Sequence, residues 1–268
     1  SRFNEVVGEV TEILNNFELG IAAQKVYDFA WSEFCDWYIE LIKPRLYGEE
    51  GQSKMAAQYT MVYVLKVTLK LLHPFMPFIT DEIYSHLEEG KSIVISKWPQ
   101  YREELKDKDA ELKISLIIEA IKSIRNVRAE MNVPPSRKAK VMMVLEDNAS
   151  MEVLEEGKKF FERLAGASEL QLMMEKKGIP EDSVSSIIPG VEIYMPLDDL
   201  IDRDKEIERL TKEKEKLLKE LDRVKGKLSN EKFISKAPES VVEEERSKEE
   251  KYQEMLDKIL ERLASLEK

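Results

Sequence analysis

The sequence predicts a mainly α-helical protein that carries a small α+β unit and ends in an antiparallel coiled-coil hairpin. Three observations lead to this fold class. Apolar residues recur at helical spacing through the first half of the chain, short β-favouring runs follow, and two heptad seams occupy the residues after Leu200. We therefore expect three domains, which are a helical domain at residues 1–140, an α+β unit at 141–199 and a coiled-coil arm at 200–268.

The first domain is predicted to be a bundle whose first four helices are separated by short breaks. These breaks lie at Leu19-Gly20, Lys43-Pro44, Gly48 to Gly51, and His73-Pro74 with Pro77. His73 ends a helix before a proline, so a packing or capping role is expected for it. Residues 90–100 then form an extended connector, and helical spacing returns from Lys106 to Met131 until Asn132 to Pro135 stops it.

The α+β unit is predicted from a change of pattern after this stop. Ala139 to Leu145 is a short β-favouring run, and Met151 to Leu164 is again helical. Glu169 to Met174 is expected to be a strand, and residues 184–188 and 191–195 a hairpin that turns at Pro189-Gly190.

The arm is predicted from apolar residues in steps of three and four. The first seam consists of Leu200, Ile207, Leu210, Leu217, Leu221, Val224 and Leu228, and the second of Val242, Tyr252, Leu256, Ile259, Leu263 and Leu266. Two helices joined by a short break can bury these seams against each other, so an intramolecular antiparallel hairpin is expected with its turn between Ser229 and Pro238.

Composition limits the class of protein. No uninterrupted apolar run is long enough to span a membrane, and the first residues do not resemble a signal peptide, so a cytoplasmic protein without a membrane segment is expected. Cys35 is the one cysteine, which excludes an internal disulfide and leaves a Cys/His zinc site short of ligands, and we expect it in the core. A net charge of -11 means that any nucleic-acid site must be a local basic patch.

Several segments resemble the anticodon-binding domain of class I aminoacyl-tRNA synthetases for valine, isoleucine and leucine. The segments, in order, are GIAAQKVYDFAWSEFCDWYIELIKP at residues 20–44, LHPFMPFITDEIY at 72–84, a connector ending in Trp98-Pro99, and IRNVRAEMNVPPSRKA at 124–139. The ending KLSNEKFISKAPESVVEEERSK at residues 227–248 resembles the C-terminal arm of the valyl enzymes. An isoleucyl enzyme would more typically end in a cysteine-rich zinc module, which a single cysteine cannot form.

This resemblance implies a noncatalytic portion of a valine–tRNA ligase with tRNA(Val) as its partner. No HIGH-like or KMSKS-like segment occurs, so the catalytic and editing domains, and the ATP used to attach valine, are expected in the rest of the parent chain. No cofactor or metal is expected in this part, the first bundle helix is expected to be truncated, and a monomer is expected. Two alternatives stay open, namely a coiled-coil scaffold for protein interaction and the equivalent region of another class I synthetase.

Two groups of residues are candidates for contact with the anticodon region of tRNA. The first group lies at a predicted helix end and consists of Lys43, Arg45 and Tyr47, for which a solvated helix end is the alternative. Trp31, Trp37 and Tyr38 could stack on bases, but their densely apolar helix favours core packing. The second group could follow phosphates or pair with acidic neighbours, and consists of Lys122, Arg125, Arg128, Arg137 and Lys138. The resemblance implies that the segment IRNVRAEMNVPP joins the bundle to the following unit, so a structural role is the alternative for Arg125 and Arg128.

The predicted tip of the arm is the third candidate, because basic residues outnumber acidic ones there. Its candidates for contact with the outer corner of tRNA are Lys219, Arg223, Lys225, Lys227, Lys232, Phe233 and Lys236. Phe233 could meet an exposed base, or could close the end of the hairpin. The resemblance implies the tRNA contact, since the arm of the valyl enzymes leans on the corner of the L-shaped tRNA.

Overall fold

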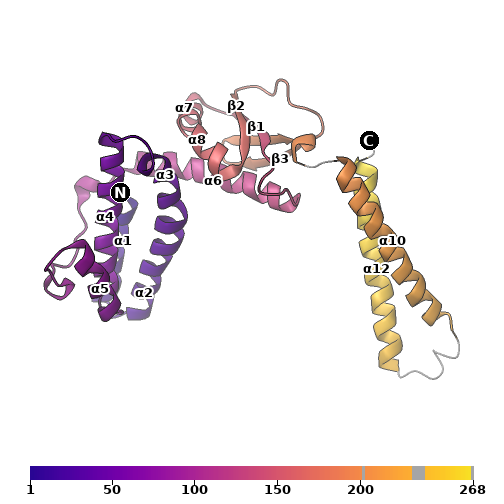
Figure 1. The fold of residues 1–268 in the computed structure, drawn as a ribbon, viewed down its shortest axis with the longest axis horizontal. Helices are drawn as coiled ribbons and strands as arrows, with labels where there is room; N and C mark the ends of the chain where they lie inside the picture. The colour runs from indigo at the N-terminus through magenta and orange to yellow at the C-terminus, as the bar shows by residue number, and fades with distance from the viewer. Residues whose placement is uncertain (201–202, 231–238, 267–268) are drawn as a thin grey trace. The chain divides into compact units, whose positions relative to one another are not determined.

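The computed structural model describes residues 1–200, 203–230 and 239–266 (Figure 1). These residues are mainly helical and include one four-stranded sheet, which confirms the predicted fold class. The chain divides into two compact units. The first unit comprises residues 1–123, 145–165 and 188–190, and the second comprises residues 124–144, 166–187 and 191–268.

The first unit is built on a helical bundle in which α1, α2 and α4 run beside one another (Figure 1). Its elements are α1 (Arg2–Asn15), α2 (Leu19–Asp28), the π-helical η1 (Phe29–Ile39), α3 (Glu40–Leu46), α4 (Gln52–Leu72) and α5 (Pro77–Leu87). The core forms because apolar side chains three or four residues apart share one face of each helix. Val6 and Val10 of α1, Val26 of α2 and Leu71 of α4 are fully buried in one cluster.

One helix boundary in the bundle was predicted wrongly. The break expected at Lys43-Pro44 is absent, because α2, η1 and α3 form one continuous helical run with Pro44 inside α3. A proline has no N–H to donate and clashes with the preceding turn, so it weakens a helix without always ending it at once. Here the helix continues for two residues and ends at Leu46.

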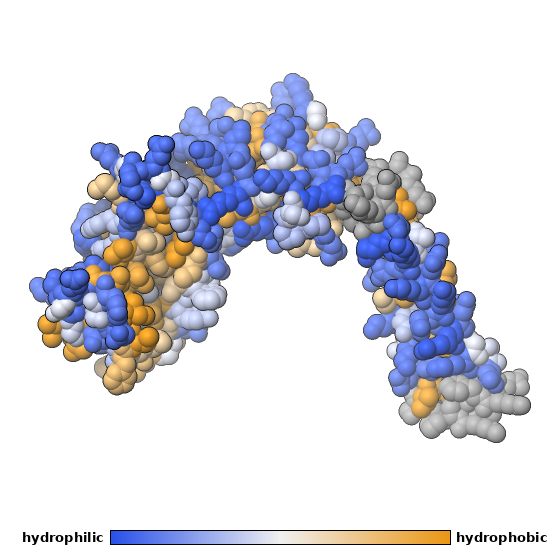
Figure 2. Space-filling view, in the orientation of Figure 1, coloured by the Kyte–Doolittle hydropathy of each residue, from blue (hydrophilic) through white to orange (hydrophobic). Residues whose placement is uncertain are grey.

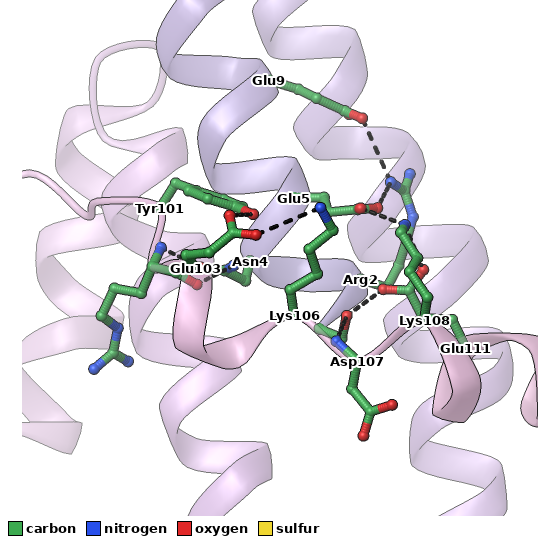
Figure 3. A network of polar contacts seen from close by, with 12 residues as sticks. Arg2, Asn4, Glu5, Glu9, Tyr101, Glu103, Lys106, Asp107, Lys108 and Glu111 are labelled. Carbon is green, nitrogen blue, oxygen red and sulfur yellow. Dashed lines mark hydrogen bonds and ion pairs between the residues drawn. The ribbon is translucent and has the colours of Figure 1, made fainter.

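A long connector between α5 and the next long helix is tied to α1 (Figure 3). It contains two short 3-10 turns, η2 (Ile93–Ile95) and η3 (Glu103–Leu105). The buried Asn4 side chain donates to the carbonyl oxygen of Arg102 and accepts from its N–H, both at 2.8 Å. The indole N–H of Trp98 donates to the Thr11 hydroxyl at 2.9 Å. These bonds fix the path of a segment that has little regular structure of its own.

Ion pairs surround the same junction (Figure 3). Arg2 lies between Glu33, whose Oε2 is 2.9 Å from Arg2 Nε, and two acids of its own helix, Glu5 and Glu9. Lys108 pairs with Glu5 and also with Glu111, the latter at 2.9 Å. The start of α1 is therefore held by charge as well as by the Asn4 bridge.

The helix α6 (Lys108–Glu130) follows, and later residues add α7 (Asn148–Glu156), α8 (Lys158–Phe160) and the π-helical η4 (Phe161–Ala165). The last three elements occupy the single helix predicted from Met151 to Leu164. Asp147 caps α7 by accepting the Ser150 N–H at 2.7 Å, and this bond lowers the pKa of Asp147. Gly157 lies close beside α6, and a Cβ there would be 2.9 Å from Cδ1 of Ile117, whose side chain would have to move.

The sheet has the strand order β2-β1-β4-β3. Its strands are β1 (Ala139–Leu145), β2 (Ala167–Met173), β3 (Ser183–Ile188) and β4 (Val191–Pro196). β1 and β2 are parallel, and their register aligns Val141 with Leu170. All four predicted strands are confirmed to within two residues at each end, and the turn between β3 and β4 falls at the predicted Pro189-Gly190.

The short helix α9 (Leu197–Leu200) precedes the arm, which consists of α10 (Arg203–Leu228) and α12 (Glu239–Leu266). These two helices pack side by side in antiparallel directions within one chain, as predicted (Figure 1). The predicted turn falls on residues 231–238, which lie outside the described residues. The buried seam residues are Leu210, Leu217, Leu221 and Val224 on α10, and Leu256, Ile259 and Leu263 on α12. On the face of the arm that Figure 2 shows, the coloured residues are mainly hydrophilic.

Candidate nucleic-acid interface

The three candidates at the end of α3 differ in how they are held. Lys43 pairs with Glu40 of its own helix. Arg45 donates from Nε to the Ser53 hydroxyl at 2.9 Å and from Nη2 to the Ser53 carbonyl oxygen at 2.8 Å, so it joins α3 to the start of α4. Tyr47 is 84% exposed and is the one of the three that presents an aromatic face to solvent.

Three aromatic residues of η1 were expected in the core, and this expectation was wrong for Trp31. Trp31 is 60% exposed and its ring is parallel to that of Tyr27, one helical turn away, with 6.5 Å between the ring centres. Trp37 and Tyr38 are half-buried, and burial raises the pKa of Tyr38. Cys35 is also exposed, against expectation. A π-helix turns each residue through a smaller angle than an α-helix does, so faces assigned with α-helical spacing are displaced along these 11 residues.

Lys122 of α6 contacts one of these aromatic rings. Its ammonium lies 5.6 Å from the centre of the Trp37 ring, a cation–π geometry. Because Lys122 remains exposed, this contact positions the ammonium without removing it from solvent.

Arg128, also on α6, is buried, whereas a residue that contacts a phosphate of bound RNA would be exposed. It is 8% exposed and donates from Nη2 to the Arg137 carbonyl oxygen at 2.6 Å and to the Pro134 carbonyl oxygen at 3.3 Å. A Cβ added to Gly166, whose φ is +69°, would lie 3.2 Å from the Arg128 Cζ. Burial lowers the pKa of this guanidinium. This geometry favours the structural alternative for Arg128.

The residues that follow α6 divide in the same way. Arg137 donates to the carbonyl oxygens of Asp198 and Asp199, both at 2.6 Å, and so closes the segment around α9. Lys138 is exposed. Arg125, which lies on α6 itself, is exposed too but is engaged with other residues. Lys138 is therefore the candidate of this group best placed for solvent-side contact.

On the arm, the described candidates lie on the last turns of α10. Lys219, Arg223 and Lys225 are exposed, and Arg223 is 3.3 Å from Glu220 of the same helix. Lys227 reaches across to α12, where its ammonium is 3.1 Å from Oε1 of Glu245. The remaining arm candidates, Lys232, Phe233 and Lys236, lie outside the described residues.

Glu245 is the acidic member of this contact. It lies in the helix seam and is only 6% exposed, although it carries a carboxylate. Lys248 is 3.3 Å from the same Oε1. The hydrogen bond from Lys227 is the main cause that lowers the pKa of Glu245 below its ordinary value. This bond links α10 to α12, so Lys227 stabilises the pairing of the two helices whether or not it also contacts nucleic acid.

One group of cationic residues in the first unit was not predicted from the sequence. A cleft of about 630 Å³ between α1, α4 and the connector is lined by Lys70, Lys97 and Arg102. Lys70 lies 27 positions before Lys97, and Lys97 and Arg102 both belong to the irregular connector. No periodic sequence pattern therefore brings the three residues together. The signal that could have been used is Tyr59, Tyr63 and Lys70, which recur along one face of α4.

Other kinds of site find no support in the residues that the structure describes. Within this part of the chain, no helix is long and apolar enough to cross a membrane. No group of three or more His, Cys, Asp or Glu residues among them is arranged to hold a metal ion.

Two family models match separate parts of the chain. A family model described as the anticodon-binding domain of tRNA ligase matches residues 1–143, and one described as the valyl tRNA synthetase tRNA binding arm matches residues 202–267. The chain is 57% identical over 267 residues to a valine–tRNA ligase of Clostridium acetobutylicum, and 53% identical over 268 residues to that of Clostridium perfringens. A valine–tRNA ligase of Bacillus cereus is 43% identical over 269 residues. These matches cover 99 to 100% of this chain but 30% of each relative, so the chain spans less than a third of their length.

Proposed function

Because the chain belongs to the family of tRNA-ligase anticodon-binding domains, we propose that it is the tRNA-holding portion of a valine–tRNA ligase. In this proposal the bundle meets the anticodon stem and loop of tRNA(Val), and the arm steadies the outer corner of the same molecule. The rest of the longer protein, with its catalytic and editing domains, attaches valine by using ATP. The protein works as a monomer in the cytoplasm.

The observation that carries this proposal is the match of the arm model to residues 202–267. Anticodon-binding bundles occur in ligases for several amino acids, so the match to the bundle alone leaves the amino acid open. The arm model is specific to valyl-tRNA synthetases by its description, and its range contains α10 and α12. The whole-length identity to valine–tRNA ligases supports the same assignment.

Such a module would contribute to catalysis without touching the reacting atoms. Binding energy gained at remote parts of a substrate can be used to orient the reacting end, which converts an encounter into a positioned reaction. For a tRNA, contacts at the anticodon and at the corner would orient the acceptor end toward a separate active site. The exposed cations Lys122, Lys138 and Lys219 suit this purpose, because phosphate contacts fix position without reading sequence.

A direct binding experiment tests this proposal. The purified chain is titrated into labelled tRNA(Val), and into a tRNA for another amino acid as control, at several salt concentrations. We expect a complex that weakens with rising salt, since released counterions make such binding salt-dependent. We also expect tighter binding of tRNA(Val) than of the control. Absence of a complex at low salt would refute the proposal.

The scaffold alternative receives less support from the arm. A scaffold that pairs with another chain needs an apolar seam open to that chain, but the described seams of α10 and α12 are buried on each other. A region of a different class I synthetase would bind its own tRNA in preference to tRNA(Val), so the same titration distinguishes that alternative from the proposed function.

A further inference from the structure

The short helix that leads into the arm, α9, is bonded to the start of the sheet. Arg137, two residues before β1, donates from Nε to the Asp199 carbonyl oxygen and from Nη2 to the Asp198 carbonyl oxygen, both at 2.6 Å. In the opposite direction, the Asp199 carboxylate accepts the N–H of Lys140 in β1 at 2.8 Å. We call these four residues the α9 clamp.

Both sides of the α9 clamp are fixed to the interior of the second unit. The carbonyl oxygen of Arg137 accepts from the buried Arg128 at 2.6 Å, and its N–H donates to the Pro134 carbonyl oxygen at 3.0 Å. On the other side, Leu200 ends α9 with a fully buried side chain. The clamp therefore joins two segments that are each anchored already, so it leaves α9 little freedom to move.

The arm begins close to this clamp along the chain. α9 ends at Leu200 and α10 begins at Arg203, three positions further on. A fully extended chain covers at most about 3.6 Å per residue, so the first residue of α10 lies within about 11 Å of Leu200. A connection this short carries the position of its anchor to the element that follows, so the place of α9 limits where the arm can start.

We propose that Arg137 and Asp199 are positioning residues, which hold α9 so that the arm starts from a fixed place and meets the same tRNA as the bundle. The proposal rests on the tRNA-binding function above. Two linked contacts on one ligand strengthen binding only where the link lets both engage at once. With the clamp broken, the arm would spend most of its time in positions from which it cannot reach the tRNA. Arg137 thus acts through α9, without the phosphate contact for which it was a candidate.

The first measurement follows the arm without RNA. Nitroxide labels are attached to cysteines introduced by Gln171→Cys in β2 and Glu215→Cys in α10, both at exposed positions, in a chain that also carries Cys35→Ser. Double electron–electron resonance then gives the distribution of distances between the two labels. Arg137→Met should broaden this distribution, and the exposed neighbour Lys138→Met should leave it as in the wild type. Equal widths for Arg137→Met and the wild type would overturn the proposal.

Asp199 offers a matched pair of variants that lose the same negative charge. Asp199→Asn keeps an oxygen that can accept the Lys140 N–H, whereas Asp199→Ala does not. Asp199→Ala should therefore broaden the distance distribution and weaken tRNA binding, and Asp199→Asn should do neither. If only repulsion between this carboxylate and a polyanion mattered, both variants would bind tRNA more tightly than the wild type, and the proposal would fail. Should Arg137→Met lose the fold of the sheet, as circular dichroism would show, the two Asp199 variants carry the test.

Titration with tRNA over a range of salt separates positioning from direct contact. Two linked contacts can exceed either affinity by about 100-fold to 10,000-fold, and a loosened arm loses part of that gain. We expect Arg137→Met to weaken tRNA binding by about 10-fold with an unchanged salt slope, because the bound state keeps its phosphate contacts. A slope lowered by about 0.7 to 0.9 would mean that Arg137 itself contacts a phosphate, against the proposal.

The two measurements also separate this inference from the function on which it rests. If the wild-type chain binds no tRNA, the proposed function fails, while the label distances still report on the clamp. If the chain binds tRNA and the variants with a broadened distribution bind it as tightly as the wild type, the inference alone fails.

Discussion

Replacing Arg128 by methionine decides between its two possible roles. Methionine is also long and unbranched, but it cannot donate to the carbonyl oxygens of Arg137 and Pro134. A hydrogen bond from a charged donor stabilises a fold by about 1.5 to 3 kcal/mol, and the 2.6 Å bond to Arg137 belongs in the upper part of that range. The 3.3 Å bond to Pro134 adds less, and relief of the buried charge offsets part of the loss. We expect a net loss of about 3 kcal/mol.

The assay is amide hydrogen exchange in β1, which follows Arg137 in the second unit. If β1 opens together with this unit, a loss of about 3 kcal/mol makes its amides exchange roughly a hundredfold faster. The control is Lys138→Met, since Lys138 is exposed and surface changes of this kind usually stay within about 0.5 kcal/mol. The control should leave exchange unchanged.

The opposite result would exclude the structural role of Arg128. If Arg128→Met leaves β1 exchange as in the wild type but lowers the salt slope of tRNA binding by about 0.9, then Arg128 contacts a phosphate. A similar acceleration in both variants would mean that the two carbonyl bonds contribute little.

Three further predictions concern the arm. Three exposed candidate residues of α10 are Lys219, Arg223 and Lys225. Replacing these three together by glutamine should lower the salt slope of tRNA binding, measured by filter binding, by about 2 to 3. Helix content, measured by circular dichroism, should not change. The pKa of Glu245 is lowered from its ordinary value of 4.5, mainly by the bond to Lys227. This bond therefore stabilises the hairpin at pH values above 4.5, and the stabilisation is lost as the pH falls through the lowered pKa. The urea midpoint of wild type should therefore exceed that of Glu245→Gln at pH 7, and equal midpoints at pH 7 would refute this. Cysteines at Leu217 and Leu256, in a chain with Cys35→Ser, should cross-link one chain to itself, and a purely intermolecular product on a gel would contradict the hairpin.

The regular elements could be predicted where local pattern and tertiary environment agree. β1 was predicted with its observed limits, Ala139 to Leu145, because a β-favouring run stands between clear helix signals. The buried residues Leu217 and Leu256 were predicted because a heptad seam requires only that its partner lie in the same hairpin. In both places the information is contained in a short segment.

The errors come from places where the environment overrides the local pattern. Pro44 lies inside α3 because the loss of one helix hydrogen bond can be offset by packing, and the buried Leu41 and Ile42 lie beside it. Trp31 and Cys35 are exposed because α-helical spacing does not apply to the π-helical η1.

The candidate sites were predicted less completely than the fold. Runs of basic residues can be found in a sequence, but the groups that they contact cannot, so the buried Arg128 and the exposed Lys138 were placed in one group of candidates. The cleft at Lys97 and Arg102 was missed because the return of the connector to α1 assembles it. No local pattern contains that information.

The bridge between Asn4 and Arg102 also has a consequence for how the protein is made. Its two partners are 98 residues apart, which is a long separation for a helical bundle, and contacts of this kind slow folding. A ribosome adds about 5 to 20 residues per second, so Arg102 is synthesised roughly 5 to 20 s after Asn4. Throughout that interval α1 has an apolar face and no connector to close over it. Among the helices that the structure describes in the first unit, α1 is thus synthesised before the others and is among the last to be covered.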